Sequence, residues 1–300
     1  MINKDYKYST EVKDNDLLRA SFNELTRKTF CFDFADWYEA GHWGDKYIPH
    51  ALLDGDKVIS NVSVNLMRFD ICGEYKNYIQ LGTIMTDTAY RGQGLNRRLM
   101  EQILEEYRVK ADGIYLFAND SVCEYYPKFG FKVSKEYEYY MTCDNLDNIS
   151  PYAIEKVGIS CGEQCELLYD TVKNYSDNAN NRNDGMFMSD NLGLYQFWFA
   201  AEFGDSIYRL PEIDTYVVAD AEGNTLHIHE IFGERRVELD RLAKSFGDNV
   251  SEIVLGYTPA HKDKLLVREH KEEDCTLFVL GDDLQRIEKD KMMFPTLSHA

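Results

Sequence analysis

Helical spacing gives way to strand alternation along the first third of the chain. Residues 14–30 place Leu17, Leu18, Phe22 and Leu25 at the spacing of a predicted amphipathic helix. From Val58 to Leu66 the period changes to two, with valines on one face and Asn or Ser on the other. This alternation is typical of a half-buried strand. A second strand is predicted over residues 77–86.

A helix and a buried strand follow. Apolar residues recur every three or four positions over 95–107, which predicts a helix with one buried face. Residues 114–118 are wholly apolar, as expected of a central strand with a parallel neighbour. A short helix is predicted up to Tyr126, because Pro127 disfavours helical geometry in the residue before it. The next strand begins at Phe131.

The second half repeats this order of elements. The pattern predicts strands at 215–219, 225–232, 251–257 and 276–280, and a helix at 238–246. We interpret this as a degenerate repeat of the first half. The pattern breaks near residues 145–151, so the expected domains are 1–148 and 149–300.

Composition narrows the classes of function. The chain has 300 residues, is 44% hydrophobic and carries a net charge of −19. Such a charge repels nucleic acid and anionic lipid and favours cationic small molecules. No apolar run reaches the ~18 residues of a membrane span, and the N-terminus lacks the apolar core of a signal peptide. The seven cysteines are scattered, which predicts reduced thiols and a cytoplasmic location.

Two pairs of residues have the spacing of metal ligands. Cys161 and Cys165 are one helical turn apart, and His227 and His229 share one face of a strand. Neither pair has a third ligand close by in the sequence. We therefore predict no metal site and assign both pairs to the structure.

The turn before the helix at 95–107 carries the first chemical signal. Gly92 and Gly94 allow backbone conformations that a Cβ would hinder. Exposed N–H groups at a helix start bind anions, and Arg91, Arg97 and Arg98 add positive charge there. Arginine in a first helical turn opposes the helix dipole, and a bound anion reverses that effect. The turn lacks the Lys-Ser/Thr of a P-loop and the G-x-G-x-x-G of a dinucleotide fold.

A second motif follows at a fixed distance. Asn119 precedes Tyr126 by seven positions, and Gly130-Phe131 completes the pattern. Arg91-Gly92-Gln93-Gly94-Leu95-Asn96 resembles the R/Q-x-x-G-x-G/A signature of the GNAT superfamily of acyl-CoA-dependent N-acetyltransferases. The second motif is similar to that superfamily's N-x-x-A-x-x-x-Y-x-x-x-G-F. The resemblance covers about residues 5–142, and the second half resembles the degenerate copy of tandem GNAT proteins.

The resemblance implies a fold, a cofactor and residue roles. The fold is α/β (α+β by some schemes): a mixed, mostly antiparallel sheet with flanking helices, followed by a second, smaller GNAT-like domain. Acetyl-CoA is the implied cofactor, and Tyr126 the catalytic residue that protonates the departing thiolate. The strand backbone would hold the pantetheine arm and stabilise the oxyanion. The implied cofactor-binding residues are Ile84, Met85, Thr86, Arg91, Gly92, Gln93, Gly94, Leu95, Asn96, Arg97 and Asn119.

The sequence leaves the identity of the general base and of the acceptor site undetermined. Some GNAT members have a basic carboxylate near the start of the central strand, where this sequence has Gln80, which cannot ionise. An aromatic and acidic segment over residues 32–47 suits an ammonium group, or is simply part of the core. The candidate bases, acting directly or through water, are Asp33, Asp36, Glu39, Asp87, His299 and the Ala300 carboxylate.

The expected function is acetyl transfer to the primary amine of a small molecule by direct attack on the thioester. A peptide or protein N-terminus is an alternative acceptor, and a non-catalytic acyl-CoA-binding or regulatory module is the rival class. The second half lacks a glycine turn at the corresponding place, residues 233–237. We therefore expect one coenzyme A per chain. The sequence leaves the oligomeric state open.

Overall fold

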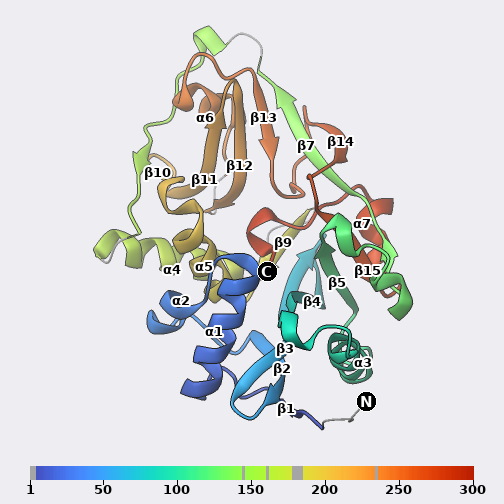
Figure 1. The fold of residues 1–300 in the computed structure, drawn as a ribbon. Coiled ribbons are helices and arrows are strands. Elements are labelled where there is room, and N and C mark those ends of the chain that lie inside the picture. The colour runs from blue at the N-terminus through green and yellow to red at the C-terminus, as the bar shows by residue number, and fades with distance from the viewer. Residues whose placement is uncertain (1–4, 144–145, 160–161, 178–184, 234–235) are drawn as a thin grey trace.

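The computed structural model describes residues 5–143, 146–159, 162–177, 185–233 and 236–300. It contains two sheets, here called sheet A and sheet B, and the C-terminal end lies between them (Figure 1). Sheet A has the order β1 (Lys7–Ser9), β2 (Tyr47–Asp54), β3 (Lys57–Ile71), β4 (Glu74–Thr86), β5 (Gly113–Ala118), β15 (Thr276–Leu280) and β6 (Lys132–Val133), and β9 (Met186–Ser189) pairs with the end of β3. Sheet B has the order β8 (Glu155–Lys156), β10 (Ile207–Leu210), β11 (Thr215–Glu222), β12 (Thr225–Phe232), β13 (Glu252–Leu255), β7 (Glu136–Thr142) and β14 (Leu266–His270). The α-helices are α1 (Asp16–Phe30), α2 (Ala35–Glu39), α3 (Leu95–Tyr107), α4 (Glu163–Asp177), α5 (Leu192–Ala201), α6 (Leu239–Phe246) and α7 (Arg286–Lys289).

The two sheets share one topology. In each, the parallel neighbours are the fourth and fifth strands, β4 with β5 and β12 with β13. A helix joins each parallel pair, α3 in sheet A and α6 in sheet B. The other strand pairs of the described chain are antiparallel. This mixed, mostly antiparallel architecture with flanking helices is the predicted fold class.

The sixth strand of each sheet comes from the other half of the sequence. β7 follows β6 in the chain but joins sheet B, between β13 and β14. β15 lies near the end of the chain but joins sheet A, between β5 and β6. The halves on either side of residue 148 are therefore interleaved in space. The division into domains 1–148 and 149–300 stays a prediction.

Helices cover both faces of sheet A. α3 buries its apolar side against one face, including Leu99 and Ile103. α1 packs on the opposite face through Phe22 and begins where the Asn15 side chain accepts hydrogen bonds from the N–H groups of its first turn. α4 and α5 contribute to a core that both sheets share, which includes Phe199. Among the described residues, no helix has the length and apolar character needed to cross a membrane.

The short helix predicted up to Tyr126 is absent. In its place lie two 3-10 turns, η2 (Asp120–Val122) and η3 (Tyr126–Phe129). Pro127 falls inside the second turn, where the first positions of a helix tolerate a residue without an N–H. Gly130, with a φ of 92°, ends the turn. The predicted helices and strands with clear periodicity are present, with ends shifted by a few residues.

Candidate active site

The glycine turn lies on the surface between η1 (Thr88–Tyr90) and α3. Gly92 and Gly94 both have a φ of 75°, a left-handed conformation that L side chains rarely adopt. A Cβ at either position would meet no atom within 4 Å, so conformation rather than crowding requires glycine. Gly94 is the N-cap of α3 and supplies no side chain to its first N–H groups. This backbone suits an anionic group such as a pyrophosphate.

Two arginines of the turn lie exposed beside it. Arg91 Nε donates a hydrogen bond to the backbone oxygen of Thr86 at 3.3 Å. Arg97 forms an exposed ion pair with Glu101 of the next helical turn, at 3.6 Å. Exposed ion pairs are weak, so either side chain can turn to a bound anion at little cost. The third arginine, Arg98, donates to the backbone oxygen of Tyr6 at 3.3 Å, and the part of all three in binding an anion stays a prediction.

The other residues of the turn hold it in place. Gln93 Oε1 accepts a hydrogen bond from the Tyr6 hydroxyl at 3.2 Å, and the Leu95 side chain is buried. Asn96 Oδ1 accepts one from the Tyr125 hydroxyl at 2.7 Å. Tyr125 thus joins the glycine turn to the second motif. The sequence reasoning missed this residue because it attended to the neighbouring Tyr126.

β4 has a free edge next to the turn. Its pairing with β5 ends at Gln80 and Tyr115, and beyond that point the two strands separate. Ile84 lies in this stretch, and Met85 and Thr86 still pair with β3 on the other side. The side chains of Ile84 and Met85 pack into the cores, so the strand offers its backbone alone. This geometry suits the pantetheine arm of coenzyme A.

A strained bulge marks the place where β4 leaves β5. Thr83 has a φ of 46° and lies where the register between β3 and β4 shifts. A β-branched residue in this conformation costs about 1–3 kcal/mol and needs support from its surroundings. Asn61 Nδ2 donates to the Thr83 backbone oxygen at 2.9 Å, and the Tyr47 hydroxyl bonds the Thr83 hydroxyl at 2.7 Å. Ser63 Oγ donates to Tyr47 at 2.9 Å, which completes a buried clamp on the bulge.

Tyr126 lies at the start of η3 and is 5% exposed. Its ring packs against Phe131 and Phe278, with centroids 6.3 Å and 5.4 Å away. Burial raises the pKa of the Tyr126 hydroxyl well above its usual value. The group therefore keeps its proton at neutral pH, as a proton donor must. Its catalytic role stays a prediction.

Asn119 has a partner within the chain. Its Nδ2 donates to the Asp274 carboxylate at 2.8 Å and to the Asp274 backbone oxygen at 3.3 Å. Asp274 belongs to the turn that leads into β15, the exchanged strand. Asn119 therefore fastens this turn to the end of β5, and its contact with the cofactor stays a prediction.

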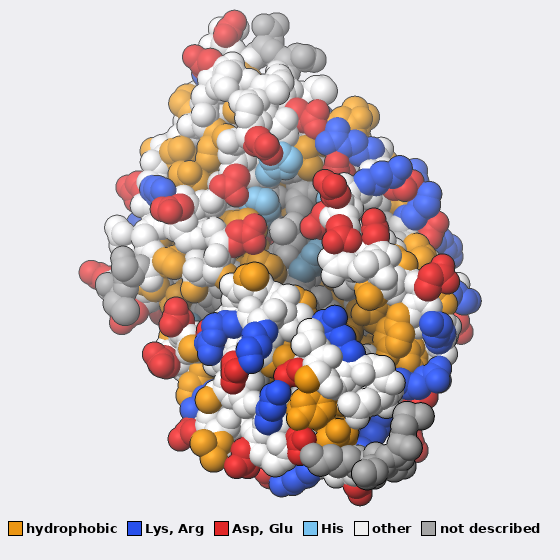
Figure 2. Space-filling view, in the orientation of Figure 1, with side chains coloured by type: hydrophobic (Ala, Val, Ile, Leu, Met, Phe, Trp, Pro, Cys, Tyr) orange, Lys and Arg blue, Asp and Glu red, His pale blue; other side chains and the backbone are white. Residues whose placement is uncertain are grey.

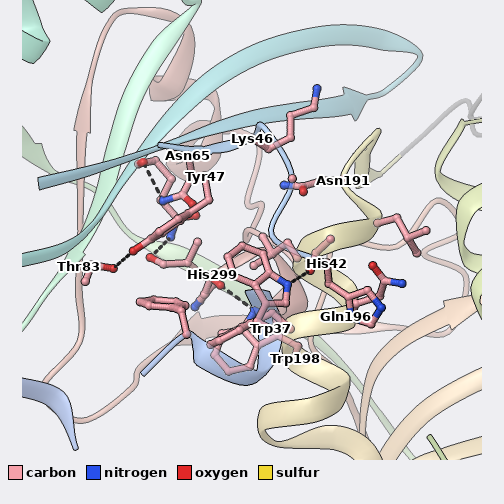
Figure 3. A pocket seen from close by; sticks show the side chains of 18 of the residues that line it. Trp37, His42, Lys46, Tyr47, Asn65, Thr83, Asn191, Gln196, Trp198 and His299 are labelled. Carbon is pink, nitrogen blue, oxygen red and sulfur yellow. Dashed lines mark hydrogen bonds between the residues drawn. The ribbon is translucent and has the colours of Figure 1, made fainter. Parts of the chain in front are cut away.

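A cavity of about 540 Å³ lies beside the bulge, on the face of sheet A that α1 and α2 cover. We call it the aromatic pocket (Figure 3). It reaches Gln80 and Thr83 of β4. Helix α5, from the second half of the sequence, forms its far wall. Its aromatic lining consists of Phe30, Phe32, Phe34, Trp37, Tyr47, Phe117, Phe197 and Trp198.

The segment singled out at 32–47 gives the pocket aromatic rings together with His42 and Lys46, but none of its acidic side chains. Trp43 lies behind the wall, with its ring 5.5 Å from that of Trp37. Asp36 and Glu39 are exposed and do not line the pocket, because the helical turn of α2 that buries Trp37 directs them outward. Asp33 forms an ion pair with Arg27 and also lies outside the lining.

The end of the chain enters this pocket. Phe294 stacks on Tyr115 and His299 stacks on Phe117, each with ring centroids 4.0 Å apart. The His299 backbone oxygen accepts a hydrogen bond from Trp198 Nε1 at 2.7 Å. We refer to residues 292–300 as the tail.

The last residue of the tail lies against β4. Gln80 Nε2 donates a hydrogen bond to the backbone oxygen of Ala300 at 3.2 Å. The same oxygen occupies the space that a Cβ on Gly82 would need. Tyr115 in turn donates to Gln80 Oε1 at 3.2 Å, which orients the amide. The position of the expected carboxylate base thus holds a donor that fixes the tail.

Only two of the six candidate bases line the aromatic pocket, His299 and Ala300. Burial lowers the pKa of His299 to about 3, so the imidazole is neutral and a very weak base. Asp87 caps η1 and pairs with Lys57 at 2.6 Å, and it lies outside the lining. Which of the candidates acts as the base stays a prediction.

Sequence reasoning missed the contribution of α5 to the pocket. Phe197 and Trp198 come from a helix almost free of polar residues, which signalled burial but not against which surface. Trp37 Nε1 donates to the Gly193 backbone oxygen at 2.8 Å, which links the two walls. A helix more than a hundred residues away in sequence carries no local sign of its partner.

A second cavity, of about 280 Å³, lies at the corresponding place in sheet B. We call it the histidine pocket, because His227, His229, His270 and His299 line it. Figure 2 shows histidines in a hollow with acidic side chains at its rim. No group of three or more His, Cys, Asp or Glu in the described part of the chain is arranged to hold a metal ion.

Comparison with known proteins places the fold. The model of the GNAT acetyltransferase domain matches residues 7–134. A conserved protein of unknown function from Enterococcus faecalis V583 has 16% identity and a TM-score of 0.60, covering 94% of this chain and 74% of its own. A GCN5-related N-acetyltransferase from Kribbella flavida has 14% identity and a TM-score of 0.57, with coverages of 92% and 70%. Eis1 from Mycobacterium abscessus has 12% identity and a TM-score of 0.55, with coverages of 91% and 72%.

These identities are low, so the structural likeness concerns the fold alone. No curated protein sequence matches the chain. The activity rests on the domain match, which spans both the glycine turn and Tyr126. The glycine turn and the free edge of β4 fit acetyl-CoA, the cofactor of this family. Residues 7–134 thus form a GNAT acetyltransferase domain, and acetyl-CoA-dependent N-acetyl transfer is the activity that this domain supports.

Proposed function

We propose that this enzyme acetylates the primary amine of a small molecule bound in the aromatic pocket. The supporting observation is that the pocket reaches Gln80 and Thr83, where β4 turns its free edge away from β5. An amine in the pocket would lie beside the backbone that suits the cofactor. The two substrates would then meet at the bulge.

The cofactor would be held by backbone groups. The N–H groups of Gly92 to Asn96 would hold the pyrophosphate, with Arg91 and Arg97 at its rim. The backbone of Ile84, Met85 and Thr86 would pair with the pantetheine arm. When bound, acetyl-CoA supplies the acetyl group as a thioester that the amine attacks directly.

Two groups of the chain would move protons. The Ala300 carboxylate, one of the candidate bases, would take a proton from the substrate ammonium, with Gln80 holding it in place. The Tyr126 hydroxyl would give its proton to the departing thiolate. A proton transfer by a positioned side chain typically contributes about 10²–10⁴-fold to the rate.

A thiol-release assay with amines and short peptides tests this function, with Tyr126→Phe as the informative variant. We expect kcat to fall about 10²-fold, with acetyl-CoA affinity by calorimetry unchanged. Tyr139→Phe, on sheet B, is the matched control. Unchanged kcat in Tyr126→Phe would remove the assigned role. Acetyl-CoA binding with no acetylated amine or peptide would favour a regulatory module.

A further inference from the structure

In the aromatic pocket, polar side chains such as Asn65 and Thr83 lie at β4, and the tryptophans Trp37 and Trp198 lie on the other side, here called the apolar end, where His42 and Gln196 are also found (Figure 3). Its polar side chains at β4 already have partners within the chain: Tyr47 bonds Thr83 at 2.7 Å, and Asn65 Nδ2 donates to the Gln80 backbone oxygen at 3.3 Å. The opposite end is formed by the rings on α2 and α5. A ligand that fills the pocket therefore has a polar head at β4 and an apolar body.

The tryptophans of the apolar end offer ring faces rather than donors. Trp37 Nε1 donates to the Gly193 backbone oxygen at 2.8 Å, and Trp198 Nε1 to the His299 backbone oxygen at 2.7 Å. The Phe34 ring lies 5.6 Å from the Phe197 ring. These surfaces favour burial of an aromatic or branched aliphatic group.

The side chains that line the pocket carry no net charge. Among the described lining residues, the ionisable side chains belong to His42, Lys46, Tyr47, Asp190 and His299. Lys46 and Asp190 form an ion pair at 2.7 Å. Tyr47 and both histidines are neutral at pH 7, because burial raises the pKa of Tyr47 and lowers the pKa of each histidine. The Ala300 carboxylate, proposed above as the base, is then the partner for an ammonium group.

We infer that the acceptor is a hydrophobic monoamine, with an aromatic or branched apolar body and a single ammonium group. This inference rests on the proposed function and names the substrate class of the same site. The second ammonium of a polyamine or aminoglycoside would either compete with Lys46 for the Asp190 carboxylate or lie among rings without a counter-charge, which is costly. The overall charge of −19 does not extend to this pocket.

Two amines of equal length test the charge argument. Hexylamine and 1,5-diaminopentane differ in whether the far end is methyl or ammonium. We expect kcat/KM for hexylamine to exceed that for the diamine by about 100-fold or more, because burying an unpaired charge costs free energy. 2-Phenylethylamine is expected to exceed both. An equal or better rate with the diamine would overturn the inference.

Substitutions test the location. Phe32, 42% exposed at the pocket, can be truncated without emptying the core, and Tyr75, 38% exposed at the start of β4, is its matched control. Phe32→Ala is expected to lower kcat/KM for 2-phenylethylamine about tenfold, since part of a buried contact is lost. Tyr75→Ala should leave it unchanged.

A charge substitution tests the same location in another way. Leu192→Glu adds a carboxylate to the lining and should reduce the ratio of kcat/KM for hexylamine to kcat/KM for the diamine. An unchanged ratio would count against the pocket as the acceptor site.

Calorimetry without acetyl-CoA separates this inference from the proposed function. Binding of 2-phenylethylamine that weakens in Phe32→Ala supports the substrate class even when no acetylation follows, and in that case the acetyltransferase proposal fails. Acetylation of diamines, with no binding of 2-phenylethylamine, supports the transferase and refutes the substrate class. Neither binding nor acetylation of any amine would refute both.

Discussion

The fourth and fifth strands separate in both sheets, but among the described residues only sheet B has the tail hydrogen-bonded to backbone at the resulting gap. In sheet A, β4 beyond Gln80 has no strand partner on the side of β5 among the described residues. In sheet B, the tail lies at the corresponding gap: Thr296 donates from its N–H and its hydroxyl to the backbone oxygen of Gly256, just after β13, at 2.8 Å and 3.0 Å. The Thr296 side chain also fills the space beside Gly256. One topology thus leads to two outcomes.

The turns that follow the fourth strands, β4 and β12, also differ, and among their described glycines only those of sheet A have open space around them. The turn in sheet A carries Gly92 and Gly94 in left-handed conformations, with open space around them. In sheet B, Gly233 lies against Thr215 and does not have a positive φ. Residues 234–235 lie outside the described residues. Cofactor binding on this fold needs unpaired backbone, and in sheet B the tail lies at the corresponding gap.

The largest expected effect concerns the exchanged strands, β7 and β15. A fragment of residues 1–148 lacks β15, which pairs with β5 over five positions and buries Phe278. We expect this fragment to aggregate or stay unfolded, because β5 would become an apolar edge strand. Circular dichroism and size-exclusion chromatography check this. Co-expression with residues 149–300 should restore a soluble complex. Cooperative unfolding of the fragment alone would show that sheet A does not depend on the exchange.

The next test concerns the tail. Two glycines added after Ala300 move the α-carboxylate by up to about 7 Å. We expect kcat to fall about 10²-fold or more, the typical contribution of a general base, with acetyl-CoA affinity retained. Steady-state kinetics and calorimetry measure the two quantities. Formate should partly restore an enzyme that lacks Ala300. Full activity in the extended protein would exclude Ala300 as the base.

A pair of glycine substitutions compares the two sheets directly. Gly94 in sheet A and Gly223 in sheet B have φ values of 75° and 61° in open surroundings. Alanine costs about 1–2 kcal/mol in either conformation. Gly94→Ala should weaken acetyl-CoA binding about tenfold, while Gly223→Ala should lower stability alone. Calorimetry should give one site per chain. Two equivalent sites, or equal effects of both substitutions on affinity, would contradict the assignment.

Much of the fold could be predicted from local sequence patterns. The helix at 95–107 and the glycine turn depend on neighbouring residues, and the structure has the helix in those bounds. The exchange of β7 and β15 could not be predicted, because an alternating strand fits either sheet equally well. The pocket depended in the same way on α5 and on Ala300. Their partners are distant in sequence, and no local pattern names a distant partner.

The last test concerns a buried carboxyl on an exchanged strand. Glu136, on β7, is buried and accepts a hydrogen bond from the N–H of Phe294 in the tail, at 2.8 Å. Burial raises the pKa of Glu136 from 4.5 to about 7. Its neighbour Glu138 differs: burial alone would raise its pKa, but hydrogen bonds from His270 and Arg268 lower it.

The two glutamates should therefore respond to pH with opposite sign. A carboxyl whose native pKa is raised binds its proton more tightly in the folded state, so its stabilising contribution is full below pH 4.5 and is lost as the pH rises to about 7. Glu136→Gln keeps the acceptor for Phe294 and never ionises. Its free energy of unfolding should exceed that of the native chain at pH 8, by at most about 3 kcal/mol, and should match it near pH 4.5. Glu138→Gln should be destabilised at pH 8. Urea unfolding across this range measures both, and a Glu136→Gln curve parallel to the native one would show that this carboxyl does not ionise within the fold.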